Sequence, residues 1–435
     1  MKNRIKQYLL AASMCVGLTA CSDFFEPIPG VQFGLDETFA SKQRTEEYLN
    51  NVYSYVREVT DAIHPNTYGG IFTEASLDGA NRWNKTYAEW TNGSFNSASA
   101  QASEYFSKYY QAIAKASTFI QNVDKCTEAA ASTRGKWKSE ARALRAYYYF
   151  ELLRLYGPIP LIGEDPIPLD ASLEELIKER NSVDECVNFI ATELQSAIDS
   201  GDLLQRAGKA NLGRMDVATC MALKAKLYLY WASPLFNGNT DQASVKNKDG
   251  KQLFPQTEDN SKWAQARDAY ERFMTFATGQ GYKLTEVYTN GKLDPYASCR
   301  AAGEFFTTTW EAVDELIFVK LRDLYDYTYW VCPKFTDFQD TDVTGGGGYY
   351  TTQETVDLFF TKDGLTIEED PSYDKFEGIP GANNFTSGRY YDPNNPSRLY
   401  FDADKSKVLK QWKDREPRFY VNITYSGSIL SLIHI

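Results

Sequence analysis

Between residues 40 and 280, apolar side chains recur about every three or four positions, which predicts a series of long helices. The clearest stripe lies in residues 100–123, at Tyr105, Tyr109, Ile113, Ala116 and Ile120. An earlier helical pattern begins near Ser41, and later helices are predicted over residues 133–156, 182–200, 215–231 and 261–278. Small residues at inner positions would let neighbouring backbones approach closely: Ala141, Ala146, Ala218, Ala222, Ala225, Ala264, Ala266 and Ala269. We therefore expect tetratricopeptide-like helix pairs, although no strict repeat of about 34 residues is legible.

Two of these helices have sequence signals at their ends. Gly157 and Pro158 predict a stop, because glycine tolerates the left-handed cap and proline cannot continue a helix. Ser182 stands three residues before Glu185, the spacing of a capping box, and predicts the start of the next helix.

From Gly279 onward the residue composition and the apolar pattern of the sequence change. Gly, Asp, Asn and Pro become frequent, and short apolar runs such as Leu316–Val319 are typical of strands. We therefore expect a mostly α fold, with a helical part over residues 41–278 and an irregular, loop-rich part with a few short strands over residues 279–429. Loops this long in a compact protein usually carry function.

The first residues predict export. The cations Lys2, Arg4 and Lys6 precede an apolar run that is too short to span a bilayer, which takes about 20 residues. The sequence Leu-Thr-Ala-Cys ending at Cys21 then resembles a lipobox, which implies removal of residues 1–20 and acylation of Cys21. An ordinary signal peptide with a chance cysteine is the alternative. Residues 21–40, which contain Pro27, Pro29 and Gly30, are interpreted as a tether.

The last six residues, 430–435, read Leu-Ser-Leu-Ile-His-Ile and resemble the translation of a sequencing adapter. We interpret them as a scar, so the native C-terminus is expected to be missing after about Ile429.

Charge and residue types exclude several functions. The formal net charge is −12, and loss of Lys2, Arg4 and Lys6 would make it −15, so the chain as a whole is a poor ligand for nucleic acid. His64 and His434 are the two histidines, which leaves no zinc-binding or histidine-dependent catalytic motif. Cysteines at 126, 186, 220, 299 and 332 form no CxxC pair and leave their redox state open. We predict no enzyme activity, no cofactor and no metal, with a calcium loop at residues 340–351 as a weak alternative because Thr351 replaces the expected Glu.

Residues 76–96 contain the side chains that sugar binding requires. Aromatic rings cover the apolar face of a sugar, and Asn, Asp and Arg satisfy its hydroxyl groups. The candidates in this segment are Asp78, Asn81, Arg82, Trp83, Asn84, Tyr87, Trp90, Asn92 and Phe95. A second candidate cluster comprises Tyr296, Arg300, Phe305, Phe306 and Trp310, and a third comprises Tyr325, Tyr327, Tyr329 and Trp330. In the alternative interpretation, Trp83 or Trp90 wedges its loop onto the helices, and the other two clusters form a protein interface.

Four local strings, in order along the chain, resemble the SusD/RagB family of outer-membrane nutrient-binding lipoproteins. They begin after Ser22-Asp23-Phe24 and comprise Glu140–Leu161, Gly213–Phe236, Thr352–Phe359 and Asp414–Phe419. The resemblance implies tetratricopeptide-like pairs in a right-handed superhelix. It also implies ligand contacts near residues 76–96 and a lid role over a TonB-dependent transporter that receives a glycan. Within the same resemblance, an oligopeptide ligand or a structural lid without its own ligand remains an alternative.

Overall fold

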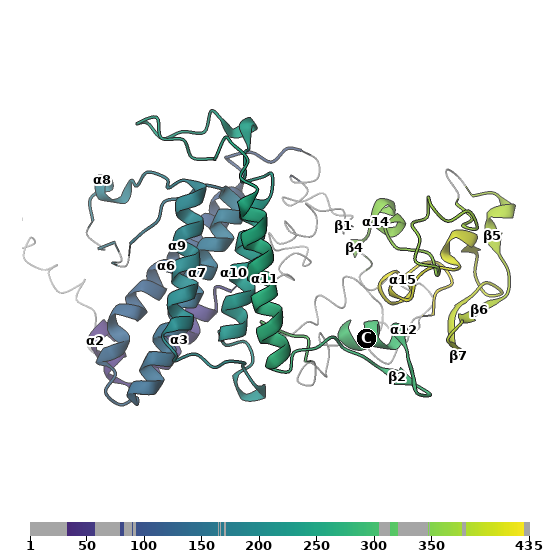
Figure 1. The fold of residues 1–435 in the computed structure, drawn as a ribbon, viewed down its shortest axis with the longest axis horizontal. Helices are drawn as coiled ribbons and strands as arrows, with labels where there is room; N and C mark the ends of the chain where they lie inside the picture. Colours follow the sequence, from purple (N-terminus) through teal and green to yellow (C-terminus); the bar gives the residue numbers. More distant parts are fainter. Residues whose placement is uncertain are drawn as a thin grey trace, which may run out of the picture.

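The structure, a computed structural model, describes residues 33–56, 79–81, 89, 93–163, 165, 167–168, 171–303, 314–320, 347, 349–375 and 380–429. Figure 1 shows a bundle of long helices beside a smaller unit of short strands and helices. The mostly α fold predicted from the sequence is confirmed. We call residues 288–303 together with 349–429 the C-terminal unit.

Long helices that follow one another in the chain form the bundle. The helices of this part are α2 (Leu35–Ala40), α3 (Lys42–Tyr53), α6 (Ala100–Asn122), α7 (Ala131–Tyr156), α8 (Leu173–Leu176), α9 (Val183–Asp199), α10 (Val217–Ala232) and α11 (Ser261–Gly279). Helix α6 packs on α7, α7 on α9, α9 on α10 and α10 on α11, so chain neighbours are also neighbours in space. Short 3-10 turns lie at Val123–Lys125, Lys209–Asn211 and Thr240–Gln242.

The predicted helix ends have the expected chemistry. Gly157 has φ +68° at the end of α7, in the left-handed region that glycine tolerates. The Ser182 amide donates to Glu185 Oε2 at 2.7 Å, and the Glu185 amide donates to Ser182 Oγ at 3.3 Å. This reciprocal capping box begins α9, as the sequence predicts.

The apolar stripes form the core of the bundle. All five stripe residues of α6 are buried, and so are six of the eight predicted inner alanines. Ala222 is half-buried and Ala264 is exposed. The inner position predicted for Ala264 is therefore wrong, because α11 packs on α10 through other residues and Ala264 is exposed.

The helical part begins earlier than predicted. Helix α2 starts at Leu35, inside the segment interpreted as a tether, and the Gly34 amide donates to Glu37 Oε2 at 3.2 Å. Phe39 is completely buried, with its ring centre 5.3 Å from Tyr48 and 5.7 Å from Phe119. Residues 35–40 therefore belong to the core, because burial of Phe39 holds α2 in place.

Short elements make up the C-terminal unit and its link to β1. They are β1 (Ala80–Asn81), β2 (Tyr288–Thr289), β3 (Lys292–Leu293), α12 (Pro295–Gly303), β4 (Tyr349–Tyr350), α14 (Gln353–Asp357), β5 (Phe385–Thr386), β6 (Arg389–Asp392), β7 (Asn395–Asp402), β8 (Val408–Leu409) and α15 (Pro417–Asn422), with 3-10 turns η8 (Ala382–Asn384) and η9 (Lys410–Trp412). The strands pair two by two and antiparallel: β1 with β4, β2 with β3, β5 with β8 and β6 with β7.

The predicted strand at Leu316–Val319 is absent. These residues lie half-buried against the bundle, where Phe318 packs on the helical core and Thr219 Oγ1 donates to the Ile317 carbonyl at 3.3 Å. A side chain of the bundle, rather than a partner strand, binds this backbone.

An aromatic cluster is the core of the C-terminal unit. Buried Tyr400, Phe401 and Val408 are surrounded by Tyr296, Tyr390, Trp412, Tyr420 and Tyr425. The rings of Tyr400 and Tyr420 stack with centres 3.9 Å apart.

The described cysteines are free thiols. Cys126, Cys186 and Cys220 are buried, and Cys299 is half-buried. Burial raises the pKa of the Cys186 thiol to about 11, which keeps it protonated and unreactive at neutral pH. Cys332 lies outside the described residues.

Candidate functional site

The first sugar-binding candidate meets a distant part of the chain. Asn81 in β1 pairs with Tyr349, and Ala80 pairs with Tyr350, in the antiparallel β1–β4 ladder. The Tyr350 side chain is more than half exposed. The ladder therefore brings an exposed tyrosine to the segment 76–96, a neighbour that sequence spacing alone did not predict.

Most of the other predicted site residues lie outside the described residues: Cys21, Asp78, Arg82, Trp83, Tyr87, Trp90 and Trp310, with the cluster at 325–330. Phe95 is described and half-buried, and its amide donates to the Glu89 carbonyl at 3.1 Å.

Tyr296 and Arg300 lie one turn apart on α12, so both belong to the same side of this helix. The Arg398 guanidinium carbon lies 4.2 Å from the centre of the Tyr296 ring, and the Tyr400 ring centre lies 5.5 Å away. Tyr296 and Arg300 are both half-buried. The Tyr296 ring is thus part of the aromatic core of the C-terminal unit as well as a candidate sugar contact.

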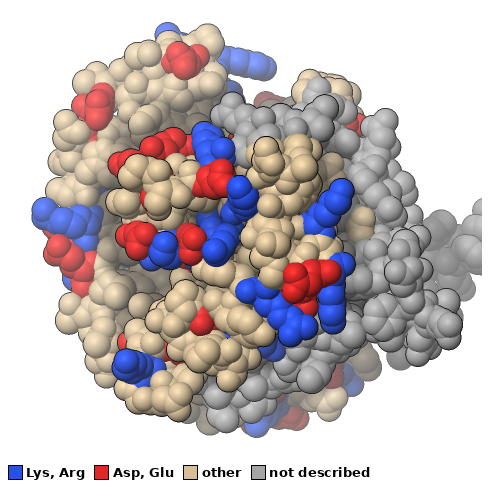
Figure 2. Space-filling model, turned by 90° about the vertical axis from the view of Figure 1, so that its right-hand side faces the viewer, with Lys and Arg blue, Asp and Glu red and all other residues tan. Residues whose placement is uncertain are grey.

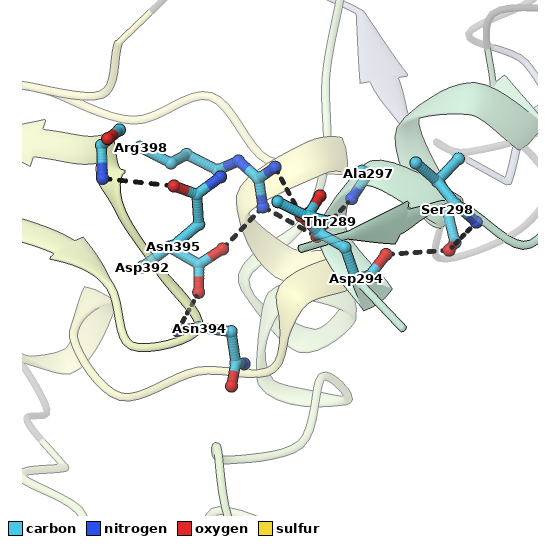
Figure 3. Close-up of polar contacts among 10 residues, drawn as sticks. Thr289, Asp294, Ala297, Ser298, Asp392, Asn394, Asn395 and Arg398 are labelled. Carbon is cyan, nitrogen blue, oxygen red and sulfur yellow. Dashed lines mark hydrogen bonds and ion pairs between the residues drawn. The ribbon is translucent and has the colours of Figure 1, made fainter. Parts of the chain in front are cut away.

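Arg398 holds two acidic residues from different elements together (Figure 3). Its Nη1 donates to Asp294 Oδ1 at 2.8 Å and to Asp392 Oδ2 at 2.7 Å, and its Nη2 donates to Asp294 Oδ2 at 2.8 Å. Asp294 also accepts hydrogen bonds from the Ala297 amide and the Thr289 hydroxyl, both at 2.9 Å. This network joins the start of α12 to the β6–β7 hairpin and thereby positions Tyr296. No local pattern indicated this network, because Asp294 and Arg398 are far apart in the chain.

Acid should weaken this network. The hydrogen bonds from Arg398 hold the pKa of Asp294 below its ordinary value of 3.8. A depressed pKa stabilises the fold above the unfolded-state pKa, and the contribution is lost as pH falls below about 4. We predict that Asp294→Asn unfolds more easily than wild type at pH 7 but loses less stability between about pH 4 and pH 2. Urea denaturation across this pH range measures it, and identical pH slopes for the two proteins would contradict the assignment.

Two of the four sequence strings meet at a buried junction. Arg214 Nε lies 3.2 Å from Glu140 Oε2, and Tyr53 Oη donates to the same oxygen at 2.8 Å. The Met215 amide donates to Tyr53 Oη at 2.8 Å. Burial raises the pKa of Glu140, while Arg214 opposes that shift. The family-like residues Glu140 and Arg214 therefore join α7 to α3 and to the loop before α10.

A cavity of about 260 Å³ lies beside this junction, between α3, residues 212–214 and residues 318–320. Its polar groups already have protein partners. Lys320 Nζ donates to the carbonyls of Val56 at 2.6 Å and Ser54 at 3.2 Å, and Arg214 Nη1 donates to Asn50 Oδ1 at 3.0 Å. These groups hold residues 318–320 onto the bundle, and we assign them a structural role.

Gly213 is required where the chain passes this cavity. It has φ +79°, and a Cβ at this position would lie 2.9 Å from the Val319 carbonyl oxygen. Gly213→Ala should lower the free energy of unfolding by about 2 kcal/mol, from backbone strain and the clash together. Gly201→Ala is the matched control, because Gly201 has φ +73° with nothing within 4 Å of its Cβ. Equal losses for the two variants in chemical denaturation would show that the contact with Val319 is unimportant.

The other two strings also meet. Arg415 is buried, and its Nη2 donates to the carbonyls of Val356 at 2.6 Å and Phe359 at 2.8 Å. The Phe360 amide donates to Glu416 Oε1 at 2.9 Å. All four strings thus contribute side chains that connect different elements of the fold, whereas the ligand candidates lie elsewhere in the chain.

No group of three or more His, Cys, Asp and Glu residues in the described part of the chain is placed to hold a metal ion. None of its helices is long and apolar enough to cross a membrane.

The architecture is that of a tetratricopeptide-like helical bundle with a loop-rich C-terminal unit. Two family models match successive parts of the sequence. Residues 32–229 match SusD-like proteins described as starch-binding and associating with the outer membrane, and residues 315–431 match the SusD family. A SusD-like protein of Bacteroides ovatus is 27% identical over 175 residues, which cover 39% of this chain and 30% of the relative. The chain belongs to the SusD/RagB family.

Solved structures agree with this fold. The protein named BT4246 superposes with a TM-score of 0.67 at 24% identity, over 88% of this chain and 64% of that one. A SusD-like protein from Bacteroides fragilis, BF3747, gives 0.62 at 19% identity, over 90% and 62% respectively. The chain therefore spans less than two thirds of the length of these relatives.

Proposed function

We propose that the chain is a cell-surface lipoprotein that binds an oligosaccharide and delivers it to a TonB-dependent transporter of the outer membrane. The observation that carries this proposal is the match of residues 32–229 to a family described as starch-binding and associating with the outer membrane. The role is binding, with no catalysis, cofactor or resident metal.

The proposed ligand platform is the segment 76–96. Trp83, Tyr87 and Trp90 would stack on sugar rings, while Asp78, Asn81 and Arg82 would bind hydroxyl groups. The pairing of β1 with β4 supports this location, since it places exposed Tyr350 opposite Ala80 of this segment. Tyr296, Arg300 and Trp310 are proposed as a second group of contacts.

Cys21 is the proposed site of lipidation, which would anchor the protein to the outer membrane. Cys21→Ala should not incorporate labelled palmitate in cells that label the wild type. Undiminished labelling of the variant would contradict the anchor.

The proposed partner is a SusC-like transporter. A lid on such a barrel should bury well above about 1,600 Å² in total. Failure to co-purify with any outer-membrane barrel after mild detergent extraction would contradict this role.

The ligand class is tested with the mature chain and a panel of polysaccharides and oligopeptides, by affinity electrophoresis and calorimetry. Binding to at least one polysaccharide, without release of reducing sugar, is expected. Binding to peptides alone would favour the peptide alternative. Binding to neither, with transporter association intact, would favour a structural lid.

A further inference from the structure

We propose that the short helix α8 contacts the lipid surface of the membrane to which Cys21 would anchor the protein. The contact is made by Leu173, Leu176 and Ile177, which we call the apolar ridge. This inference rests on the proposed lipid anchor and adds a second, non-covalent contact between the protein and the membrane.

The apolar ridge is exposed to solvent. Its three members, in chain order, are exposed at 73%, 51% and 68%. Their spacing of three and four residues places them on one side of the helix, and Glu174, Glu175 and Lys178 fall on the other side. No residue of α8 is buried, and every residue from 172 to 180 is exposed. The ridge therefore adds little to the stability of the fold, and a contiguous exposed apolar patch usually marks an interaction surface.

Local hydrogen bonds hold α8 as a helical turn although it buries nothing. The Ser172 amide donates to Glu175 Oε2 at 2.8 Å, and Ser172 Oγ donates to the same oxygen at 2.9 Å. The Ile177 amide donates to the Leu173 carbonyl at 3.1 Å. The ridge is thus presented by a capped turn, in which the apolar and acidic sides are kept apart.

The end of α6 connects α8 to the first described helix. Lys125 Nζ lies 2.8 Å from Asp36 Oδ1 of α2. One turn earlier, Gln121 Nε2 donates at 2.7 Å to Oδ1 of Asp165, in the connection that carries α8. Figure 1 shows both α2 and α8 on the side of the bundle that faces away from the C-terminal unit.

The length of the proposed tether favours a membrane as the occupant of the ridge. The chain from Cys21 to Phe33 spans at most about 40 Å when fully extended, so acylation of Cys21 would hold the start of α2 within that distance of the lipid. The opposite end of the molecule is less suited to lipid. Figure 2 looks onto the C-terminal unit and shows Lys, Arg, Asp and Glu side chains spread over it.

An amphipathic turn can lie at a membrane surface without spanning the bilayer. Its aliphatic side chains enter the boundary between headgroups and acyl chains, while its charged side stays in water. The ridge has this division, and burial of its three side chains in lipid would add to the hold of the acyl chains.

The test is hydrogen exchange of the acylated chain on phosphatidylcholine vesicles, read by mass spectrometry. Peptides that contain α8 should exchange at least about fivefold more slowly on vesicles than in the unacylated Cys21→Ala chain in solution. Changing the three ridge residues together to Ser should abolish this protection. The matched control changes Leu284, Leu293 and Leu358 to Ser, since these leucines are exposed at 74%, 48% and 70%, and it should keep the protection of α8.

Each other outcome overturns the inference. Protection in the Cys21→Ala chain without vesicles would mean that the chain's own residues cover the ridge, and protection that persists in the ridge variant would show that the apolar side chains are not responsible. Protection that requires a transporter in the vesicles would make the ridge a protein contact. Unprotected α8 in vesicle-bound wild type would remove the membrane contact and leave the proposed function intact, whereas a wild type that neither incorporates palmitate nor binds vesicles would contradict the proposed anchor as well.

Discussion

Glu193→Ala should lower the free energy of unfolding by about 3–5 kcal/mol, because it leaves a buried arginine without its counter-ion. Arg145 is completely buried in α7, and its Nε donates to Glu193 Oε2 of α9 at 2.8 Å. Its Nη1 donates to Ser117 Oγ of α6 at 3.1 Å, and Arg142 Nη1 donates to Glu193 Oε1 at 3.0 Å. One carboxylate thus pairs with two arginines where three helices meet.

Guanidinium denaturation monitored by far-ultraviolet circular dichroism measures this effect. Glu179→Ala is the control, because Glu179 is exposed in the connection between α8 and α9. It should change the free energy of unfolding by less than about 0.5 kcal/mol. A loss below about 1 kcal/mol for Glu193→Ala would mean that Arg145 reaches water or another acceptor.

Arg415→Leu should destabilise the C-terminal unit by about 3 kcal/mol or more, because hydrogen bonds from charged groups are worth about 1.5–3 kcal/mol each. The guanidinium binds the carbonyls of Val356 and Phe359, and it also donates to Tyr373 Oη. Leucine fills much of the space and leaves these three acceptors without their donor.

Hydrogen exchange of peptides from residues 353–375 and 408–422 reports on this unit separately from the bundle. Arg418→Leu is the matched control, since Arg418 belongs to the same string but its side chain is 55% exposed. Faster exchange in the Arg415 variant alone is expected. Equal protection in both variants would contradict a structural role for Arg415.

Sequence reasoning succeeded where the structure follows local periodicity. The stripe of α6, the capping box at Ser182 and the glycine cap at Gly157 each depend on residues within a turn or two of one another. It failed where long-range packing determines the conformation of a segment or the exposure of a side chain. Leu316–Val319 is apolar like a strand, but it lies against the bundle, and Ala264 resembles its buried neighbours although it is exposed on α11.

The candidate site shows the same division. Composition pointed to residues 76–96, but nothing local indicated that Asn81 would pair with Tyr349 or that Arg398 would cover Tyr296. These contacts join residues far apart in the chain, and only the folded topology brings them together. The family-like strings were informative about the fold, since buried Glu140, buried Arg415 and half-buried Arg214 connect its elements.

The most direct test of glycan binding at residues 76–96 compares Trp83→Ala and Trp90→Ala with wild type. Calorimetry measures the affinity for an oligosaccharide that the wild type binds, and thermal melting measures stability. Trp263→Ala is the control, because Trp263 is an exposed tryptophan of α11. The proposed platform predicts a loss of about 2 kcal/mol in binding, roughly thirtyfold in affinity, with an unchanged melting temperature for at least one of the two variants. A lowered melting temperature with unchanged affinity in both variants would show that these tryptophans are core residues and would contradict the platform.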